Sequence, residues 1–221
     1  MNQEVFKKFN ERLSNRLNHF GLSEIREDSI RYDFFLALAE VENLESWDIQ
    51  LEWPINSNSY VARDNADSKR KEKPLLDLVV DIGKLKIDIE FGLFRQNSNN
   101  KGSINKTNRA VKMMNDMIRL CLDSYYAKRD ALFICVADHK MIGHQLRTEI
   151  IGPFPSDYQI TKSKIKKQQK TKTSNFDPRF LEVFFNKNFE VDAKIIYNEI
   201  LSAKKVTNET RIIVWRVKNK S

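Results

Sequence analysis

The chain has 221 residues, of which 41% are hydrophobic, and its 38 Lys and Arg against 30 Asp and Glu give a formal net charge of +8. This length and apolar content suffice for a buried core, which excludes a disordered chain and a small disulfide-stapled domain. The positive charge favours a polyanionic partner or an acidic surface without indicating a fold.

The cysteines and the apolar segments indicate in which cellular compartment the protein resides. Cys121 and Cys135 lie in apolar surroundings without a CxxC pair or a Cys/His cluster, which predicts buried thiols in a reducing compartment and no structural zinc. The longest apolar run, 131–137, is far shorter than the ~20 residues of a membrane span, and the N-terminus lacks a signal-peptide core. We therefore expect a soluble, cytoplasmic protein without a membrane partner.

The first third of the chain begins with two predicted helices. Apolar residues recur at helical spacing over 5–20 and over 29–44. The period changes to two over 47–53, which predicts a strand that ends at Pro54. The polar stretch 56–74 is long for a connection in a compact domain, so we expect it to be functional or mobile.

The segment 74–94 predicts two strands joined by a two-residue turn at Gly83-Lys84. Beyond it, helical and extended patterns alternate. In chain order they predict a helix after the polar loop 96–103, a buried strand over 131–137, short helices over 141–151 and from Pro178, a helix over 191–204 and a strand over 211–217. This order indicates a mixed sheet flanked by helices.

The predicted hairpin separates apolar from charged residues. With the turn at Gly83-Lys84, one face is apolar and the other carries Asp77, Val79, Asp81, Lys86, Asp88 and Glu90. Asp77 stands opposite Glu90, and like charges repel at the ~4.5–5.5 Å Cβ spacing of opposed residues. Such carboxylates are solvated, share a proton or hold a divalent cation such as Mg²⁺.

These residues resemble a known nuclease signature. Pro74-Leu75-Leu76-Asp77, followed eleven residues on by Asp88-Ile89-Glu90, is similar to the PD-(D/E)xK motif, in which two acids on adjacent strands bind Mg²⁺. Two residues, Leu75 and Leu76, separate Pro74 from Asp77, and Glu90 occupies the position of the motif's lysine. A branch of type II restriction endonucleases carries Glu or Gln there, and the chain resembles that branch.

The resemblance implies an α/β (α+β) fold with a restriction-endonuclease-like core, a mixed central sheet flanked by helices. The core would cover about 29–137 of a single nuclease domain over residues 1–221. The C-terminal part, 138–221, would carry a mobile basic loop over 162–175.

The resemblance also implies roles for named residues. Asp77 and Asp88 would ligate Mg²⁺, and Glu90 would position or deprotonate the attacking water. A helical glutamate often completes such sites; Glu40 on the second predicted helix is the candidate here, and Glu52 on the following strand is its rival.

Duplex DNA binding requires cations for the phosphates and Arg, Asn or Gln side chains for the base edges. We expect these contacts from the segment after the catalytic strand and from the basic run in the C-terminal part. The candidate DNA-binding residues are Arg95, Gln96, Asn97, Lys106 and Arg109 in the first segment and Lys164, Lys166 and Lys167 in the second.

Together these expectations describe an Mg²⁺-dependent type II restriction endonuclease that hydrolyses phosphodiester bonds of double-stranded DNA at a short palindromic sequence. A palindromic site calls for a homodimer, and a cognate DNA methyltransferase is the partner expected in such a system. Two alternatives stay open: a structure-specific repair or recombination nuclease of the same fold, and a non-catalytic DNA-binding protein with a decayed site.

Overall fold

The computed structural model describes residues 1–62, 73–95, 105–145, 152–170 and 176–220. Its helices are α1 (Gln3–His19), α2 (Glu27–Glu42), α3 (Lys106–Ala127), α4 (Lys162–Gln169) and α5 (Pro178–Asn186), with short 3-10 turns at Ser46–Asp48 and Ser57–Ser59. Its strands are β1 (Ile49–Pro54), β2 (Leu75–Ile82), β3 (Leu85–Phe94), β4 (Asp130–Asp138), β5 (Tyr158–Ile160), β6 (Val191–Ile200) and β7 (Thr210–Asn219).

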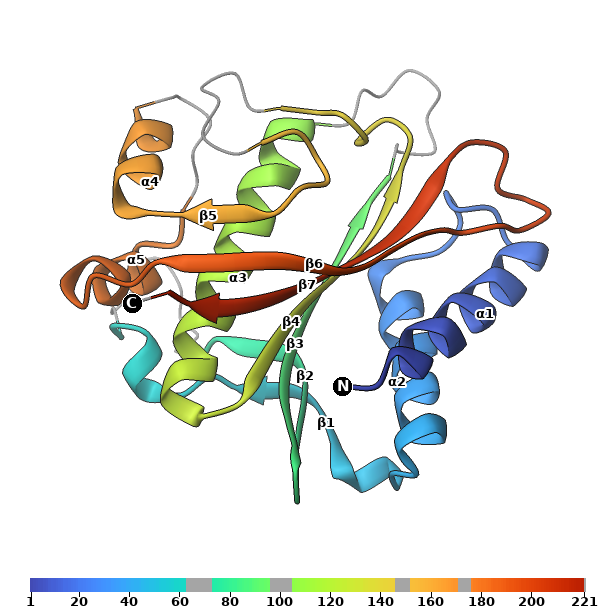
Figure 1. The fold of residues 1–221 in the computed structure, drawn as a ribbon, viewed down its shortest axis with the longest axis horizontal. Helices are drawn as coiled ribbons and strands as arrows, with labels where there is room; N and C mark the ends of the chain where they lie inside the picture. Colours follow the sequence, from blue (N-terminus) through green and yellow to red (C-terminus); the bar gives the residue numbers. More distant parts are fainter. Residues whose placement is uncertain (63–72, 96–104, 146–151, 171–175, 221) are drawn as a thin grey trace.

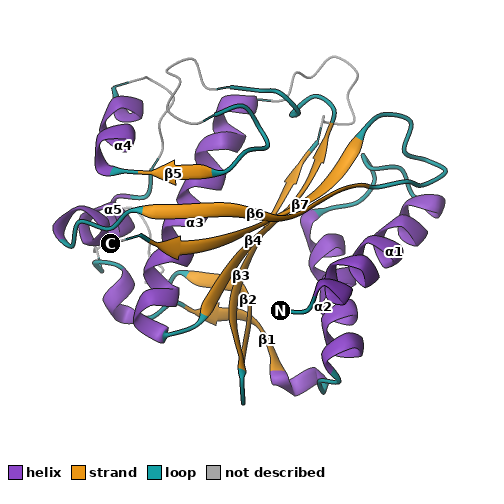
Figure 2. Ribbon diagram, viewed as in Figure 1, coloured by secondary structure: helices purple, strands orange, loops and turns teal. Residues whose placement is uncertain are grey.

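The seven strands form one mixed sheet in the order β1-β2-β3-β4-β7-β6-β5 (Figure 1). Strands β3 and β4 are parallel and are connected through α3, while every other neighbouring pair is antiparallel. Helices α1 and α2 cover one face, and α3, α4 and α5 cover the other (Figure 2). This arrangement confirms the predicted class of a mixed sheet flanked by helices.

Each face of the sheet has its own apolar core. Phe34 of α2 packs edge-on against Phe91 of β3 on the α1–α2 side, with ring centroids 5.5 Å apart. On the opposite side, Met117 of α3 lies in a second core with Phe133 of β4 and Trp215 of β7. Because both faces of the sheet are buried, the sequences of the central strands consist largely of apolar residues.

The predicted hairpin is confirmed in its turn and register. Gly83 has φ +53°, the left-handed conformation that a tight turn favours. Ile82 pairs with Leu85, and the register continues to Leu78 opposite Ile89. The apolar face of the hairpin therefore packs under α1 and α2, and the charged face turns toward α3.

Beyond residue 160, two of the predicted elements are wrong. The predicted helix over 191–204 is strand β6, because its backbone pairs with β7 along its length and with β5 at its start. The predicted mobile loop is helix α4 over its first eight residues. Thr161 caps this helix, and Ile165 is buried beneath it; residues 171–175 lie outside the described ranges.

The predicted short helix over 141–151 is not found in its described part. Residues 139–143 form turns, and Gly143 has φ +75°; residues 146–151 are not described. Within the described ranges, no helix has the length and apolar character that crossing a membrane requires.

Close packing of aromatic rings leaves no room for a side chain at Gly92 of β3. A Cβ atom at this position would lie 3.0 Å from the ring of Phe133 and 3.1 Å from the ring of Phe94. Both rings are buried in the α3-side core and have little room to move. We expect Gly92→Ala to lower the free energy of unfolding by about 1–3 kcal/mol through overpacking, measured by urea denaturation; an unchanged midpoint would contradict this packing.

Candidate active site

Strand β3 continues beyond the part that pairs with β2. The β2–β3 register ends at Leu78 and Ile89, whereas β3 runs on to Phe94. Along this free edge, charged side chains form hydrogen bonds with the backbone N–H and C=O groups of β3. Phe91 N–H donates to Asp77 Oδ2 (2.8 Å), Leu93 N–H donates to Glu27 Oε2 (3.2 Å), and Lys112 Nζ donates to Phe91 O (3.1 Å). The strands thus separate at the place where the acids gather.

Glu90 is the most deeply buried acid at this opening. Its side chain is 4% exposed, and its Oε1 lies 3.0 Å from Arg119 Nη2. Burial raises the pKa of Glu90 well above its ordinary value, and the neighbouring carboxylates of Asp116 and Asp77 raise it further against the opposing charge of Arg119. Among the described residues, Arg119 meets Oε1 as an ion pair and no group donates a hydrogen bond to it. A buried carboxyl with a perturbed pKa is typical of a functional site.

Asp77 lies beside Glu90 and remains partly accessible. It forms an ion pair with Arg31 of α2, whose Nη2 is 2.7 Å from Asp77 Oδ1. Arg31 also reaches Glu52 of β1 at 3.4 Å. Asp77 therefore joins the edge of β3 to the start of α2, and Glu52 stands at the rim of this contact, 66% exposed.

Helix α3 contributes the remaining charges. Lys112, Asp116 and Arg119 are spaced i, i+4 and i+7 and so share one helix face. Lys112 Nζ lies 2.9 Å from Asp116 Oδ2 and 3.7 Å from Glu27 Oε1. Burial lowers the pKa of Lys112, but the carboxylates of Asp116, Glu27 and Glu90 outweigh it and raise the pKa above its ordinary value. Lys112 therefore stays protonated.

These residues form the charged cluster. Its members are the acids Glu27, Asp77, Glu90 and Asp116 and the bases Arg31, Lys112 and Arg119. Helices α2 and α3 cover opposite faces of the sheet (Figure 2), and their charges meet because β2 no longer separates them along the free edge of β3.

Asp88 lies apart from the charged cluster, in the paired part of the hairpin opposite Val79. It is fully buried, and its Oδ1 accepts a hydrogen bond from Arg129 Nε at 2.5 Å. Arg129 also bonds Asp123 Oδ2 at 2.9 Å. Burial raises the pKa of Asp88 to about 8, and the nearby Asp123 carboxylate adds to the shift. The structure thus brings Asp77 and Glu90 together and holds Asp88 in a separate network with Arg129.

The helical acid at the site is Glu27 rather than Glu40. Glu40 faces α1, where it pairs with Lys8 (2.9 Å) and Arg12. Glu27 was missed because the predicted helix began at residue 29, whereas α2 begins two residues earlier. The polar spacing of Lys112, Asp116 and Arg119, opposite the apolar stripe of α3, is the sequence signal that marks the other missed residues.

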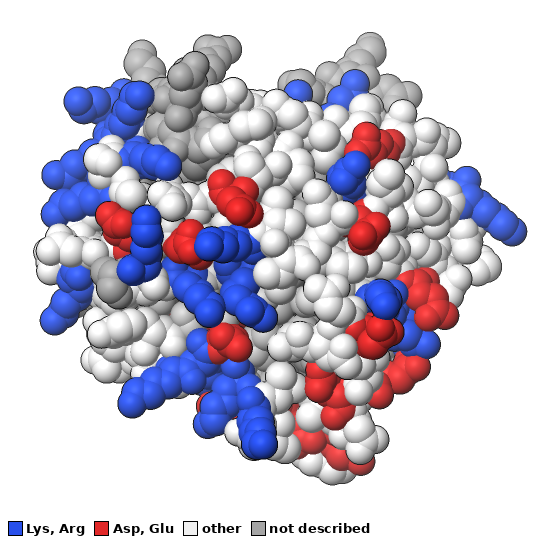
Figure 3. Space-filling view, viewed as in Figure 1, with Lys and Arg blue, Asp and Glu red and all other residues white. Residues whose placement is uncertain are grey.

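The predicted DNA-binding residues fall into two groups. Arg95, Lys106 and Arg109 lie at the end of β3 and in the first turn of α3, and Gln96 and Asn97 are outside the described residues. Lys164, Lys166 and Lys167 are on α4, where Lys164 Nζ donates to Gln159 O at 2.7 Å. Figure 3 shows Lys and Arg gathered on the side of α4 and α5, and Asp and Glu near α1 and α2.

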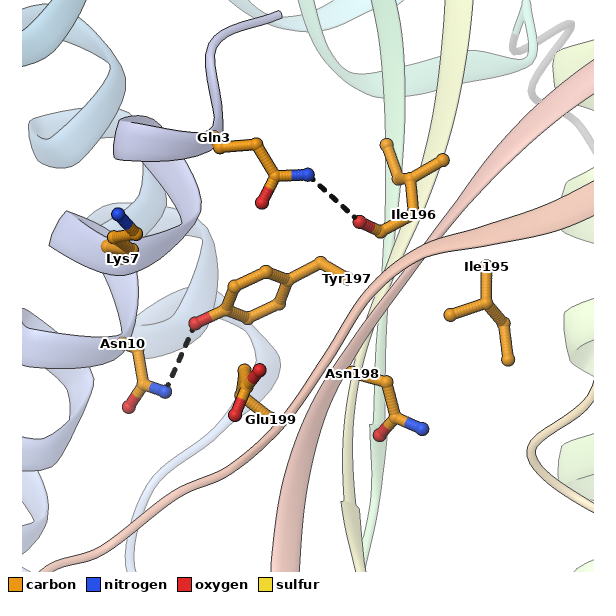
Figure 4. Close-up of a pocket in the computed structure, with 8 residues that line it drawn as sticks. All are labelled: Gln3, Lys7, Asn10, Ile195, Ile196, Tyr197, Asn198 and Glu199. Carbon is orange, nitrogen blue, oxygen red and sulfur yellow. Dashed lines mark hydrogen bonds between the residues drawn. The ribbon is translucent and has the colours of Figure 1, made fainter.

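An open pocket of about 560 Å³ lies between α1 and β6 (Figure 4). Two hydrogen bonds join groups of its lining. Gln3 Nε2 donates to Ile196 O at 3.2 Å, and Asn10 Nδ2 donates to Tyr197 Oη at 3.3 Å. Its lining holds a single carboxylate, Glu199. The paired, buried acids of the charged cluster are therefore the stronger candidate for chemistry.

The charged cluster offers a pair of carboxylates for a divalent cation. Across the described residues, no three or more His, Cys, Asp or Glu side chains are grouped as a metal site requires. Mg²⁺ is held in many enzymes by one or two carboxylates together with water and substrate phosphate oxygens. Asp77 and Glu90 meet that smaller requirement, and within the described part of the chain Oε1 of Glu90 accepts no hydrogen bond beyond its ion pair with Arg119.

Comparison of the chain with protein-family models, with curated proteins and with solved structures finds no match.

Proposed function

We propose that this protein is an Mg²⁺-dependent endonuclease that hydrolyses phosphodiester bonds of double-stranded DNA, and that it acts at a short specific sequence as type II restriction endonucleases do. The observation that carries the proposal is that Asp77 binds the N–H of Phe91, the residue after the buried Glu90, and that its charge acts on Glu90 beside Lys112 and Arg119. Two carboxylates next to clustered cations suit a metal ion and a phosphate together.

In this proposal Asp77 and Glu90 hold the cation, and Asp88 has a structural role. The metal, when bound, would polarise the scissile phosphate and lower the pKa of a water molecule. Arg31 and Arg119, which neutralise the two carboxylates, are guanidinium groups that also pair well with phosphate oxygens. Their exchange from carboxylate to phosphate would expose the acids as the substrate binds.

Lys112 supplies a fixed positive charge in the proposed site. Its ammonium group is held by Phe91 O, Asp116 and Glu27, all within 3.7 Å. A preorganised cation at this place stabilises the negative charge that develops on the phosphate in the transition state. The lysine that the sequence motif lacks on β3 is thereby replaced, in function, by one from α3.

We expect Lys112→Met to lower kcat for DNA cleavage on the order of 10²-fold with little change in KM. Because the raised pKa keeps Lys112 charged, the pH profile of the wild-type protein has no loss of activity from this lysine up to about pH 10. The measurement is steady-state cleavage of a labelled duplex, with Lys112→Arg as the charge-conserving comparison. Equal kcat values for Lys112→Met and wild type would remove Lys112 from the proposed site.

The proposed function itself is tested by incubating the purified protein with linear plasmid or phage DNA in Mg²⁺ and in EDTA. Discrete fragments that form only with Mg²⁺ and carry 5′-phosphates are the expected result. Cleavage of branched DNA alone would indicate the structure-specific alternative. If the DNA stays intact with every divalent metal and a gel shift persists in EDTA, the protein binds DNA without cleaving it, and the nuclease proposal is wrong.

The non-catalytic alternative has one observation in its favour. Both carboxylates of the pair are already neutralised, Asp77 by Arg31 and Glu90 by Arg119. In a decayed site such ion pairs would be permanent, and Mg²⁺ would then leave the protein's affinity for DNA unchanged.

A further inference from the structure

Two arginines, Arg26 and Arg109, lie close enough to Arg95 at the far end of β3 for their charges to act on its guanidinium group. Arg95 directly follows the strand, Arg26 immediately precedes α2, and Arg109 lies in the first turn of α3. Arg95 Nη2 donates to Ile25 O at 3.1 Å, which fixes its guanidinium against the residue before Arg26. Three elements of the fold therefore deliver positive charge to one place.

The charges of these arginines act on one another. Burial lowers the pKa of the Arg95 guanidinium, and the positive charges of Arg109 and Arg26 lower it further. Asp138 at the end of β4 opposes this shift. Lys106, one turn before Arg109, adds a fourth positive charge; burial lowers the pKa of the nearby His144, and Lys106 lowers it further. Mutual repulsion of this kind costs stability, and a bound anion relieves it.

The environment differs from that of the charged cluster. There, carboxylates and cations alternate and balance. At the arginine group, the first turn of α3 carries no acid, and its N-cap is the neutral Asn105. The partial positive charge of the start of this 22-residue helix adds to the arginines. The chemistry that fits is a phosphate group, because guanidinium groups match phosphate oxygens in geometry and charge.

We infer that Arg26, Arg95 and Arg109 form a binding site for a non-scissile phosphate of the DNA strand, separate from the proposed catalytic acids. This inference rests on the proposed function for its ligand. Glu90 and Arg95 are five residues apart on an extended strand, which spans about 16 Å. A phosphate at the acids and another at the arginines would thus lie a few nucleotides apart on one DNA strand.

The phosphate at this subsite anchors the strand and takes no part in the reaction. Affinity for DNA should therefore depend on the arginines without any metal, whereas cleavage depends on the acids and the metal. Arg26 is exposed and Arg109 is half-buried, so both side chains are replaceable with little cost in folding. Arg95, which is anchored to Ile25, is left intact.

The test is the salt dependence of binding to a labelled duplex, followed by fluorescence anisotropy in EDTA. The Arg26→Gln/Arg109→Gln variant is compared with wild type, with the charge-conserving Arg26→Lys/Arg109→Lys variant, and with Lys7→Gln on α1, 64% exposed, as a control for lost charge. Thermal unfolding of each variant checks the fold.

We expect the glutamine variant to bind DNA at least about tenfold more weakly and to lower the slope of log K against log salt by about 1, which is the loss of one phosphate contact. The lysine variant should keep the slope of wild type. A glutamine variant whose affinity and slope match those of Lys7→Gln would overturn the subsite and leave the proposed nuclease function untouched. Weakened binding in a protein that cleaves no DNA would support the subsite and contradict the nuclease.

Discussion

Asp77→Asn and Glu90→Gln are each expected to lower Mg²⁺-dependent DNA cleavage on the order of 10³-fold or more. Asp77 and Glu90 are the two carboxylates that meet on the free edge of β3, and each variant removes the negative charge from one of them without changing its shape. Steady-state kinetics on a single labelled duplex separate kcat from KM. The loss should appear in kcat, because DNA affinity rests on cations elsewhere.

Asp81→Asn is the matched control for this pair. Asp81 belongs to the same hairpin but lies near the turn, where it is 43% exposed and bonded to Lys86 at 2.9 Å. Its cleavage activity should stay within about twofold of wild type. Cleavage that survives in both Asp77→Asn and Glu90→Gln would locate the chemistry elsewhere in the chain.

The second large effect is on stability. Arg129→Met should lower the free energy of unfolding by about 3–5 kcal/mol, because it leaves the buried Asp123 carboxylate without its counter-charge and both buried carboxyl groups without their shared hydrogen-bond donor. Arg129 bonds both Asp88 and Asp123, and the two carboxylate side chains are fully buried. Adding Asp88→Asn to this variant should recover part of the loss, which urea denaturation of the single and double variants measures.

The same network predicts how stability varies with pH. The folded chain keeps a proton on Asp88, whose pKa is raised to about 8, while the unfolded chain releases it near pH 4. Stability contributed by this group therefore falls as pH rises from about 4 to about 8, by on the order of 1 kcal/mol per pH unit. Asp88→Asn should flatten that fall and remain active. Loss of cleavage in Asp88→Asn with an unchanged pH dependence of stability would indicate that Asp88 is a metal ligand, as the sequence motif implies.

Local patterns in the sequence predicted most of the sheet. The hairpin followed from period-two alternation around Gly83-Lys84, and its register is as expected. The apolar residues of 191–200 satisfy both the helical and the strand period, so the local pattern predicts a helix there, and only the long-range pairing with β7 makes this segment strand β6. Helix α4 was missed because charge dominates its composition, while its stability rests on a cap at Thr161 and on the buried Ile165.

The candidate site was half predictable for a physical reason. The predicted register extends to Asp77 opposite Glu90; in the structure the paired register ends one position earlier, and Asp77 binds the N–H of Phe91 next to Glu90. That Asp88 shares their face is also a property of the register, but its partner Arg129 comes from the junction between α3 and β4, which no local pattern reveals. Lys112 and Glu27 reach the site because β2 pairs with β3 only from Leu78 onward. The separation of the two strands before Leu78 depends on the packing of whole elements.

The central claim is that Asp77 and Glu90, and not Asp88, hold the divalent cation. Mn²⁺ binding followed by electron paramagnetic resonance tests it most directly, on wild type, Asp77→Asn/Glu90→Gln and Asp88→Asn, each with and without duplex DNA. We predict that wild type and Asp88→Asn bind Mn²⁺ in the presence of DNA and that the double variant does not. Binding that persists in the double variant and disappears in Asp88→Asn would contradict the site described above.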